Sequence, residues 1–354
     1  MNRPFKDRYD LLRQKIAKFV LDKKTKQNKV FDISKTKSIL FLRNDDKIGD
    51  MLISTLLFRE IKKAYPHIKI FVLCGSCNKE IIKYNPNVDE IIELERNFFK
   101  NILKFRELAK RKISLIADFL PLNPKPKYLL MLKLLKPEFL TGYYKEQYNI
   151  YDFSFEKRSP LIHITDYYGI FLDFLGIKNP SFKYDLFLNP NSAAAKYSDK
   201  DPQRKSIIIN PSAASRHRRL SIDKLISLAD LIGKSVKCRI FILSYGNVSE
   251  SLKPLISENV LIFQSKSILD AAEIIKNCDL VISPDTSIVH IADAFNKKLI
   301  SLYPEMDRPD NIIWTPRYLH AVNLFVDTKG GLVSNDVENI SDETIVKEAL
   351  KLLC

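Results

Sequence analysis

Three carboxylates of possible catalytic use lie in one short stretch, SILFLRNDDKIGDMLISTLLFREIKKAYP at residues 38–66. The pattern predicts a buried strand, a short polar loop, and a Gly49–Asp50 step that opens an amphipathic helix. In α/β proteins, a strand whose loop leads into a helix N-terminus is a common place for chemistry. We therefore take Asp50 as the candidate general base, with Asp45 and Asp46 of the same loop as competing carboxylates.

The simplest alternative role for Asp50 is helix capping, with Gly49 supplying the turn. The positive end of the helix is expected to lower the pKa of the Asp50 carboxyl and to keep it ionised. An ionised carboxylate is ready to accept a proton as an acceptor hydroxyl attacks, so capping and catalysis do not exclude each other.

A second candidate site is the segment SPDTSIVHIADAF at 283–295, which runs from a predicted strand end into a helix. Free backbone N–H groups and the positive helix end near Thr286 make an anion site that suits a diphosphate. Asp285 would repel a phosphate and is better suited to sugar hydroxyls beside it. Capping of the helix by Asp285 is the alternative without a ligand.

The loop NPSAASRHRRLS at 210–221 follows another predicted strand. Its small residues let a ligand approach the backbone, and Arg216, Arg218 and Arg219 offer guanidinium groups that match phosphate oxygens. A solvated loop is the alternative. Because this loop and the one at Asp285 both leave strand ends of one domain, we expect them to converge on one anion.

Other chemistries have less support in the sequence. Cys74 and Cys77 form a CxxC between a predicted strand and helix, but the chain is far larger than a redox domain. One such pair does not complete a four-ligand zinc site. There is no GxGxxG, GxxxxGK[ST] or HExxH motif, so dehydrogenase, P-loop and zincin functions are not supported.

Short apolar runs alternate with helical stretches along the chain, which predicts an α/β fold with parallel, doubly wound sheets. A length of 354 residues favours two domains. A polar, aperiodic segment marks the boundary between them, and a helix is expected at 249–257. The predicted divisions are an N-terminal domain at 1–188 with a basic helix at 1–29, a linker at 189–205, a C-terminal domain at 206–340 and a C-terminal helix at 341–354.

The net charge of +15 favours an anionic partner, such as a membrane or a phosphorylated substrate. Nucleic acid ranks lower, because no arginine-rich tail or RNP-type segment is present. In the basic segment 1–29, Leu12, Ile16, Phe19 and Val20 recur at helical spacing. This segment either lies on an anionic leaflet or packs on the domain with its charges solvated.

The compartment is expected to be the cytoplasm. The N-terminus is too charged for a signal peptide, no run of about 20 apolar residues occurs, and five cysteines suggest a reducing environment. A peripheral position on the cytoplasmic face of the inner membrane is compatible with the charge.

Three features occur in an order that resembles glycosyltransferase family 9, the bacterial heptosyltransferases of lipopolysaccharide core assembly. They are Arg43 followed by Ile48-Gly49-Asp50, a helix ending in LFREIKKAYP at 57–66, and the segment Asp285-Thr286-x-x-x-His290-x-Ala292. The resemblance covers about residues 37–330.

The resemblance implies a GT-B fold, in which two Rossmann-like domains with parallel sheets face each other across a cleft. The N-terminal domain would hold an anionic glycolipid acceptor and the C-terminal domain a nucleotide sugar. The implied reaction is a metal-independent, inverting transfer of heptose, or a similar sugar, from ADP-heptose onto the lipopolysaccharide or lipooligosaccharide core. No cofactor and no nucleic acid are implied.

The resemblance also implies roles for single residues. Asp50 would be the base, and Arg218 would bind the donor diphosphate. The remaining donor-binding candidates are Ser212, Asp285, Thr286, Ser287 and His290. The chain has Ser287 where the family commonly has glycine, and Arg218 and Leu220 where it commonly has lysine and tryptophan, which bears on the identity of nucleotide and sugar.

Two other functions stay open at this point. The chain could transfer a different nucleotide sugar. It could also be a non-catalytic GT-B protein that binds a polyanion or a membrane. Binding of a nucleotide sugar separates an enzyme of this kind from a binding module.

Overall fold

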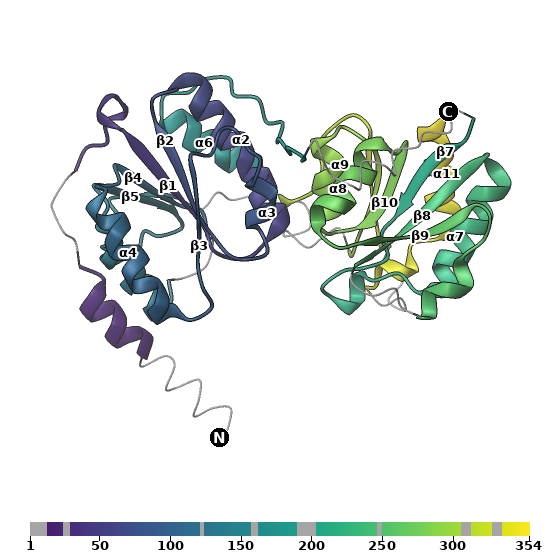
Figure 1. Ribbon diagram of the computed structural model, residues 1–354, viewed down its shortest axis with the longest axis horizontal. Coiled ribbons are helices and arrows are strands. Elements are labelled where there is room, and N and C mark those ends of the chain that lie inside the picture. Colours follow the sequence, from purple (N-terminus) through teal and green to yellow (C-terminus); the bar gives the residue numbers. More distant parts are fainter. Residues whose placement is uncertain are drawn as a thin grey trace. The chain divides into compact units, whose positions relative to one another are not determined.

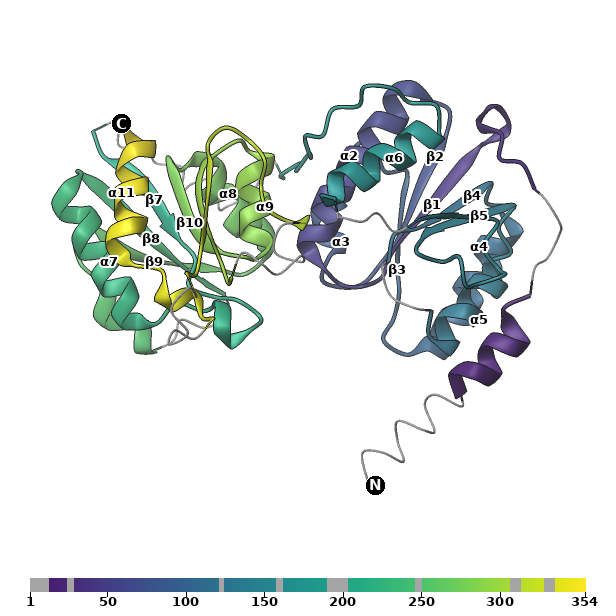
Figure 2. The same ribbon diagram turned by 180° about the vertical axis from the view of Figure 1, so that it is seen from behind.

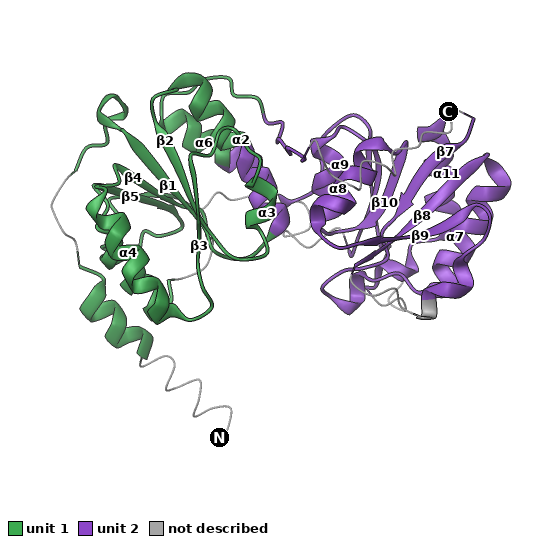
Figure 3. Ribbon diagram, in the orientation of Figure 1, with its two compact units in different colours: residues 1–47, 56–161, 168–181 green, residues 48–55, 162–167, 182–354 purple. Residues whose placement is uncertain are grey.

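A computed structural model of the chain describes residues 13–23, 29–120, 124–156, 162–189, 203–245, 250–305, 313–327 and 335–354. It divides into two compact units (Figure 3). Unit 1 comprises residues 1–47, 56–161 and 168–181, and unit 2 comprises 48–55, 162–167 and 182–354. The predicted linker at 189–205 lies mostly outside the described residues, so the predicted domain boundary stays a prediction.

The first series of elements begins with a short 3-10 helix at Ile33–Lys35 and continues as alternating strands and helices (Figure 1). Its members are β1 (Ser38–Arg43), α2 (Ile48–Ala64), β2 (Lys69–Cys74), α3 (Lys79–Ile82), β3 (Glu90–Glu93), α4 (Asn101–Lys110), β4 (Leu115–Asp118), α5 (Pro126–Leu135), β5 (Phe139–Tyr143), β6 (Phe153–Phe155) and α6 (Ile164–Phe174).

The sheet of unit 1 is parallel throughout, in the order β3-β2-β1-β4-β5-β6. Strand β1 is buried along its whole length, which accounts for its unbroken apolar sequence. Leu40 and Leu42 belong to the apolar cluster formed with α4 and α5. Phe41 points to the other face, where its ring meets Phe58 of α2 and Phe171 of α6.

The second series has the same alternation of elements, seen from behind in Figure 2. Its members are β7 (Lys205–Ile209), the 3-10 helix η4 (Arg216–Arg218), α7 (Ile222–Ser235), β8 (Cys238–Tyr245), the 3-10 helix η5 (Glu250–Leu255), β9 (Val260–Ser265), α8 (Ile268–Asn277), β10 (Leu280–Pro284), α9 (Ser287–Ala294), β11 (Lys298–Tyr303), β12 (Ala321–Phe325), the 3-10 helix η6 (Val337–Asn339) and α11 (Asp342–Leu353).

The sheet of unit 2 is also parallel, in the order β12-β11-β10-β7-β8-β9. Numbered along each series, both sheets have the Rossmann order 3-2-1-4-5-6. The order in which strands are added across the sheet therefore reverses between β1 and β4 in one sheet and between β7 and β10 in the other. Ligands in such sheets bind in a crevice at this switch point, outside the carboxyl ends of the strands.

The elements expected from the sequence are largely present, with one correction. The helix expected at 249–257 is instead a short 3-10 helix with Pro254 inside it. Proline lacks the N–H that an α-helix needs and clashes with the preceding turn, so a regular helix cannot form there. At the C-terminus, the expected helix begins after Ser341, whose side chain accepts a hydrogen bond from the Thr344 N–H.

Candidate active site

The three carboxylates that follow β1 have different surroundings. Asp45 pairs with the buried guanidinium of Arg43, with 3.4 Å between Oδ2 and Nη2. Asp46 has a φ of 57° and accepts a hydrogen bond of 2.9 Å from the backbone N–H of Cys77. Both therefore have structural partners within unit 1. Asp50 lies further on, in the first turn of α2.

Asp50 does not occupy the N-cap position of α2. The N-cap is Lys47, without a side-chain capping bond, and the helix begins at Ile48. The alternative in which Asp50 is the N-cap of this helix is therefore wrong, because Asp50 lies inside the first turn. The backbone carbonyl of Asp50 accepts a hydrogen bond of 2.7 Å from the Ser54 hydroxyl, one turn along the helix. Residues 48–55 belong to unit 2, so Asp50 shares a compact unit with the donor-binding candidates.

The imidazole of His290 lies directly against Gly49. A Cβ at Gly49 would come within 2.6 Å of His290 Cδ2 and 3.3 Å of Nε2. No ordinary side chain fits at that distance, so position 49 must be glycine for the backbone to approach the ring. This contact explains why a glycine precedes Asp50, and it brings the first turn of α2 to α9.

His290 is buried, with 5% of its surface exposed. Burial lowers its pKa, an effect that the negative charges of Asp285 and Asp50 oppose. Its Nδ1 has no hydrogen-bond partner among the residues that the structure describes. The ring of Tyr184 meets the imidazole at an angle of 67°, with the centroids 6.3 Å apart. Burial therefore favours the neutral imidazole, which lies within electrostatic reach of both carboxylates.

The two loops that were expected to converge do so through Asn210, at the end of β7. Its buried side-chain amide lies 3.0 Å from Ser283 Oγ and 3.1 Å from Thr286 Oγ1. Its Oδ1 accepts from the Ser212 backbone N–H at 3.2 Å. Asn210 thus joins the loop after β7 to the loop after β10 across the switch point of the sheet.

Arg218 and Asp285 make the second link between these loops. Arg218 Nη1 donates to the Asp285 carboxylate at 2.5 Å and to its backbone carbonyl at 3.0 Å. The other guanidinium N–H groups of Arg218 make no hydrogen bond with any described residue, and the side chain is 29% exposed. The pair fixes one edge of the guanidinium and leaves donors available for an anion.

The N-terminus of α9 is capped by Thr286, whose hydroxyl oxygen accepts from the Ile288 N–H at 3.3 Å. The alternative in which Asp285 caps this helix is therefore wrong, because its carboxylate pairs with Arg218. Ser287 is the first residue of the helix and is half-buried, and Ser212 is exposed in the neighbouring loop.

A further segment holds the arginine-bearing loop from its other side. The His217 imidazole pairs with Asp336, and the Ser221 N–H donates to the Glu338 carboxylate at 3.0 Å. The ammonium group of Lys224, buried in α7, donates to the Glu338 backbone carbonyl at 3.0 Å. The loop carrying Arg218 is thus fixed at both sides.

The sequence interpretation did not single out Asn210 or Glu338. Asn210 could have been found from its place: it is a polar residue directly after a buried apolar strand, where the Rossmann switch point puts the ligand loops. No local pattern marks Glu338, which lies 117 residues from the serine that it holds.

The CxxC shows no feature of a reactive dithiol. Burial raises the pKa of the Cys74 thiol to about 12, which disfavours the reactive thiolate. Cys77 is exposed, and both are free cysteines. Among the described residues, no cluster of three or more His, Cys, Asp or Glu side chains is arranged to hold a metal ion.

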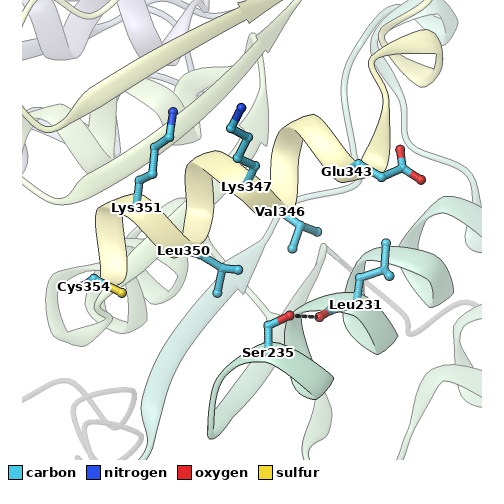
Figure 4. Close-up of a pocket in the computed structure, with 8 residues that line it drawn as sticks. All are labelled: Leu231, Ser235, Glu343, Val346, Lys347, Leu350, Lys351 and Cys354. Carbon is cyan, nitrogen blue, oxygen red and sulfur yellow. Dashed lines mark hydrogen bonds between the residues drawn. The ribbon is translucent and has the colours of Figure 1, made fainter.

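A groove also lies between α7 and α11 of unit 2 (Figure 4). Its walls include Leu231 and Ser235 on α7, and Val346, Leu350 and Cys354 on the opposite side. None of the candidate site residues lines it. In the described part of the chain, no helix is long and apolar enough to span a bilayer.

Solved structures of similar fold include glycosyltransferases. One is a family 9 glycosyltransferase of Veillonella parvula DSM 2008 (TM-score 0.75, 18% identity, 92% of this chain and 99% of that one). Another is the ADP-heptose LPS heptosyltransferase II of Escherichia coli (TM-score 0.70, 15% identity, 89% and 98%). Together with the two Rossmann-like sheets, these neighbours define an α/β fold of the GT-B type.

The sequence agrees with this assignment. Residues 130–323, more than half of the chain, match the model of glycosyltransferase family 9 (heptosyltransferase). A candidate lipopolysaccharide heptosyltransferase 4 of E. coli K12 is 25% identical over 338 residues, which cover 92% of this chain and 90% of that protein. The chain belongs to glycosyltransferase family 9 and is a glycosyltransferase. Asp50 lies outside the matched segment, so the family match does not bear on its role, which is argued from the contacts around it.

The Gly49–His290 contact predicts that Gly49→Ala will be destabilising. The new methyl group would overlap a buried ring, and overpacking of this kind costs about 1–3 kcal/mol. We expect a lower urea midpoint of unfolding. Gly233→Ala is the matched control, because Gly233 lies in α7 with nothing within 4 Å of the added Cβ, and it should be neutral or stabilising. Equal behaviour of the two variants would contradict the contact.

The carboxyl of Asp293 in α9 predicts that the stability of the folded protein depends on pH. Burial raises its pKa from 3.8 to about 6, against the opposing effects of the Tyr184 hydroxyl bond and the Lys183 charge. The folded state therefore favours the protonated acid. Its contribution to stability is complete below about pH 4 and is lost as pH rises through 6, a change on the order of 3 kcal/mol.

Asp293→Asn removes this titration and keeps an oxygen that can accept the Tyr184 hydroxyl. Urea midpoints measured from pH 4 to 7 should show that the variant gains stability relative to the unaltered protein as pH rises. A constant difference across this range would show that Asp293 titrates normally.

Proposed function

We propose that this glycosyltransferase transfers a heptose, or a similar sugar, from a nucleotide sugar onto the lipopolysaccharide or lipooligosaccharide core, with ADP-heptose as the donor. The family match and the names of the relatives support the sugar and the acceptor. The observation that carries the chemistry is the contact of Gly49 with His290. Asp50 follows this glycine and belongs to the same compact unit as Arg218 and Asp285, which supports a shared site.

Asp50 acts as the base in this proposal. An acceptor hydroxyl oxygen attacks the anomeric carbon of the donor as its proton passes to the Asp50 carboxylate. The bond from that carbon to the diphosphate oxygen breaks on the opposite face, so the configuration at the anomeric carbon inverts. The nucleoside diphosphate leaves with the bonding electron pair.

Negative charge grows on the leaving diphosphate in the transition state. The free guanidinium donors of Arg218 and the backbone N–H groups at the start of α9 are fixed before the reaction, so they stabilise this charge without reorganising. We propose that this positive charge makes a divalent metal unnecessary. In this proposal, Ser212, Thr286 and Ser287, from the same two loops, are further donor contacts.

Asp285 and His290 orient the sugar in this proposal. Asp285 uses one carboxylate oxygen for Arg218, and its remaining acceptor capacity suits sugar hydroxyls. The unpartnered His290 Nδ1 can accept from, or donate to, one hydroxyl. The acceptor is a glycolipid, so the protein is proposed to work in peripheral contact with the inner membrane.

Asp50→Asn should lower turnover by at least about two orders of magnitude, the usual contribution of a general base. Folding and nucleotide affinity should be unchanged. The measurement is transfer of heptose from ADP-heptose to core-truncated lipopolysaccharide. Asp46→Asn is the matched control, since it lies in the same loop and an asparagine oxygen still accepts the Cys77 N–H. Near-normal turnover of Asp50→Asn would remove Asp50 from this role.

Arg218→Ala should weaken binding of ADP and ADP-heptose by about tenfold or more, as expected for a charged hydrogen bond to phosphate. Thermal shift in EDTA buffer measures the change in affinity, because a ligand at 100 times its dissociation constant adds about 2.7 kcal/mol to the free energy of unfolding. Arg216→Ala, an exposed arginine of the same 3-10 helix, is the control. If UDP- or GDP-sugars alone stabilise the protein, the donor is a different nucleotide sugar.

A further inference from the structure

The N-terminal helix of unit 1, at residues 13–21 (Figure 1), is attached to the rest of that unit through polar side chains. The Lys18 ammonium lies 4.8 Å from the ring centroid of Tyr148. Asp22, just after the helix, is buried and accepts a hydrogen bond of 2.8 Å from the Ile150 N–H. This side of the helix therefore packs on unit 1.

The apolar side of the same helix is exposed. Ile16, Phe19 and Val20 expose 56%, 80% and 50% of their surface. Their spacing of three and four residues places them on one face, opposite Lys18 and Asp22. A surface helix normally buries its apolar stripe and exposes its charges. Here the arrangement is reversed, and such an exposed apolar face indicates an interaction surface.

Basic residues surround this face. Arg13, Lys15 and Lys23 are exposed, and the Lys23 ammonium lies 6.0 Å from the Phe19 ring centroid. Within the described segment 13–23, Asp22 is the only acidic residue, and it is buried, so this segment exposes no negative side chain. The surface that the helix presents is thus apolar at its centre and positive at its rim.

We propose that this helix face, Ile16, Phe19 and Val20 with Arg13, Lys15 and Lys23, docks on an anionic lipid bilayer. Lysine is depleted at interfaces between proteins, whereas the negative surface potential of an anionic leaflet attracts each basic residue near it. The three apolar side chains enter the region between headgroups and acyl chains. The inference deepens the proposed function, because it names the surface that would bring the site to a glycolipid acceptor.

Vesicle sedimentation of the full chain tests the proposal, with phosphatidylcholine vesicles that contain or lack phosphatidylglycerol. The protein should sediment with the anionic vesicles and less so as salt increases. The triple variant Ile16→Ser, Phe19→Ser and Val20→Ser should bind at least about tenfold more weakly, because its serine side chains bury less apolar area in the bilayer. Lys15→Glu with Lys23→Glu should weaken binding most at low salt.

Leu319→Ser is the matched control, since Leu319 is 92% exposed in unit 2 and its loss should leave vesicle binding unchanged. Absence of sedimentation with anionic vesicles, or equal binding by the triple variant, would overturn the proposal. So would light scattering that shows a dimer of the unaltered protein and a monomer of the triple variant, because a second copy would then cover the face.

Transfer to a deacylated core acceptor in solution separates this inference from the proposed function. The triple variant should keep that activity, because the exposed face is not part of the site. A protein that binds vesicles but transfers no sugar to either acceptor would contradict the proposed function and leave the docking surface in place.

Discussion

The close approach of the α2 backbone to the His290 imidazole is the constraint on which the candidate site depends. It requires a residue without a side chain at position 49, and it sets the next residue, Asp50, within the electrostatic reach of His290. Any larger residue at position 49 would separate the two helix ends and the groups they carry. The glycine is thus a steric requirement of the site.

The opposite side of the site is held by side chains that neutralise each other. Arg218 and Asp285 form an ion pair, and Asn210 ties the two loops that carry them. An arginine that is already oriented loses less side-chain entropy when a phosphate binds. Because Asp285 engages one edge of the guanidinium, the pair leaves the other edge for an anion while it lowers the positive charge of the empty loop.

The sequence predicted the parts of this architecture that follow from periodicity and parallel topology. Runs such as SILFLR and SIIIN have to be buried on both faces, and parallel strands have to place their carboxyl ends at one edge. The convergence of Arg218 and Asp285 follows from that rule. Their ion pair and the Asn210 links do not, because they depend on side-chain positions between segments more than 65 residues apart.

Local patterns were also ambiguous where two residues compete for one role. Both Asp50 and Asp285 have residue types that cap helices, yet Lys47 and Thr286 occupy the N-cap positions. In the N-terminal helix, periodicity showed an apolar face but not its direction. Contacts of Lys18 and Asp22 with unit 1 decide that the apolar face is the exposed one.

The state of His290 completes the argument for the site. An imidazolium beside Asp50 would form an ion pair with that carboxylate and hold it in the charged form, which would oppose its protonation during transfer. Burial lowers the pKa of His290 and favours the neutral ring. A neutral imidazole fills the space against Gly49 without competing for the proton. In the proposed reaction, the burial that leaves Nδ1 unpartnered thus also keeps a positive charge away from the neighbouring carboxylate.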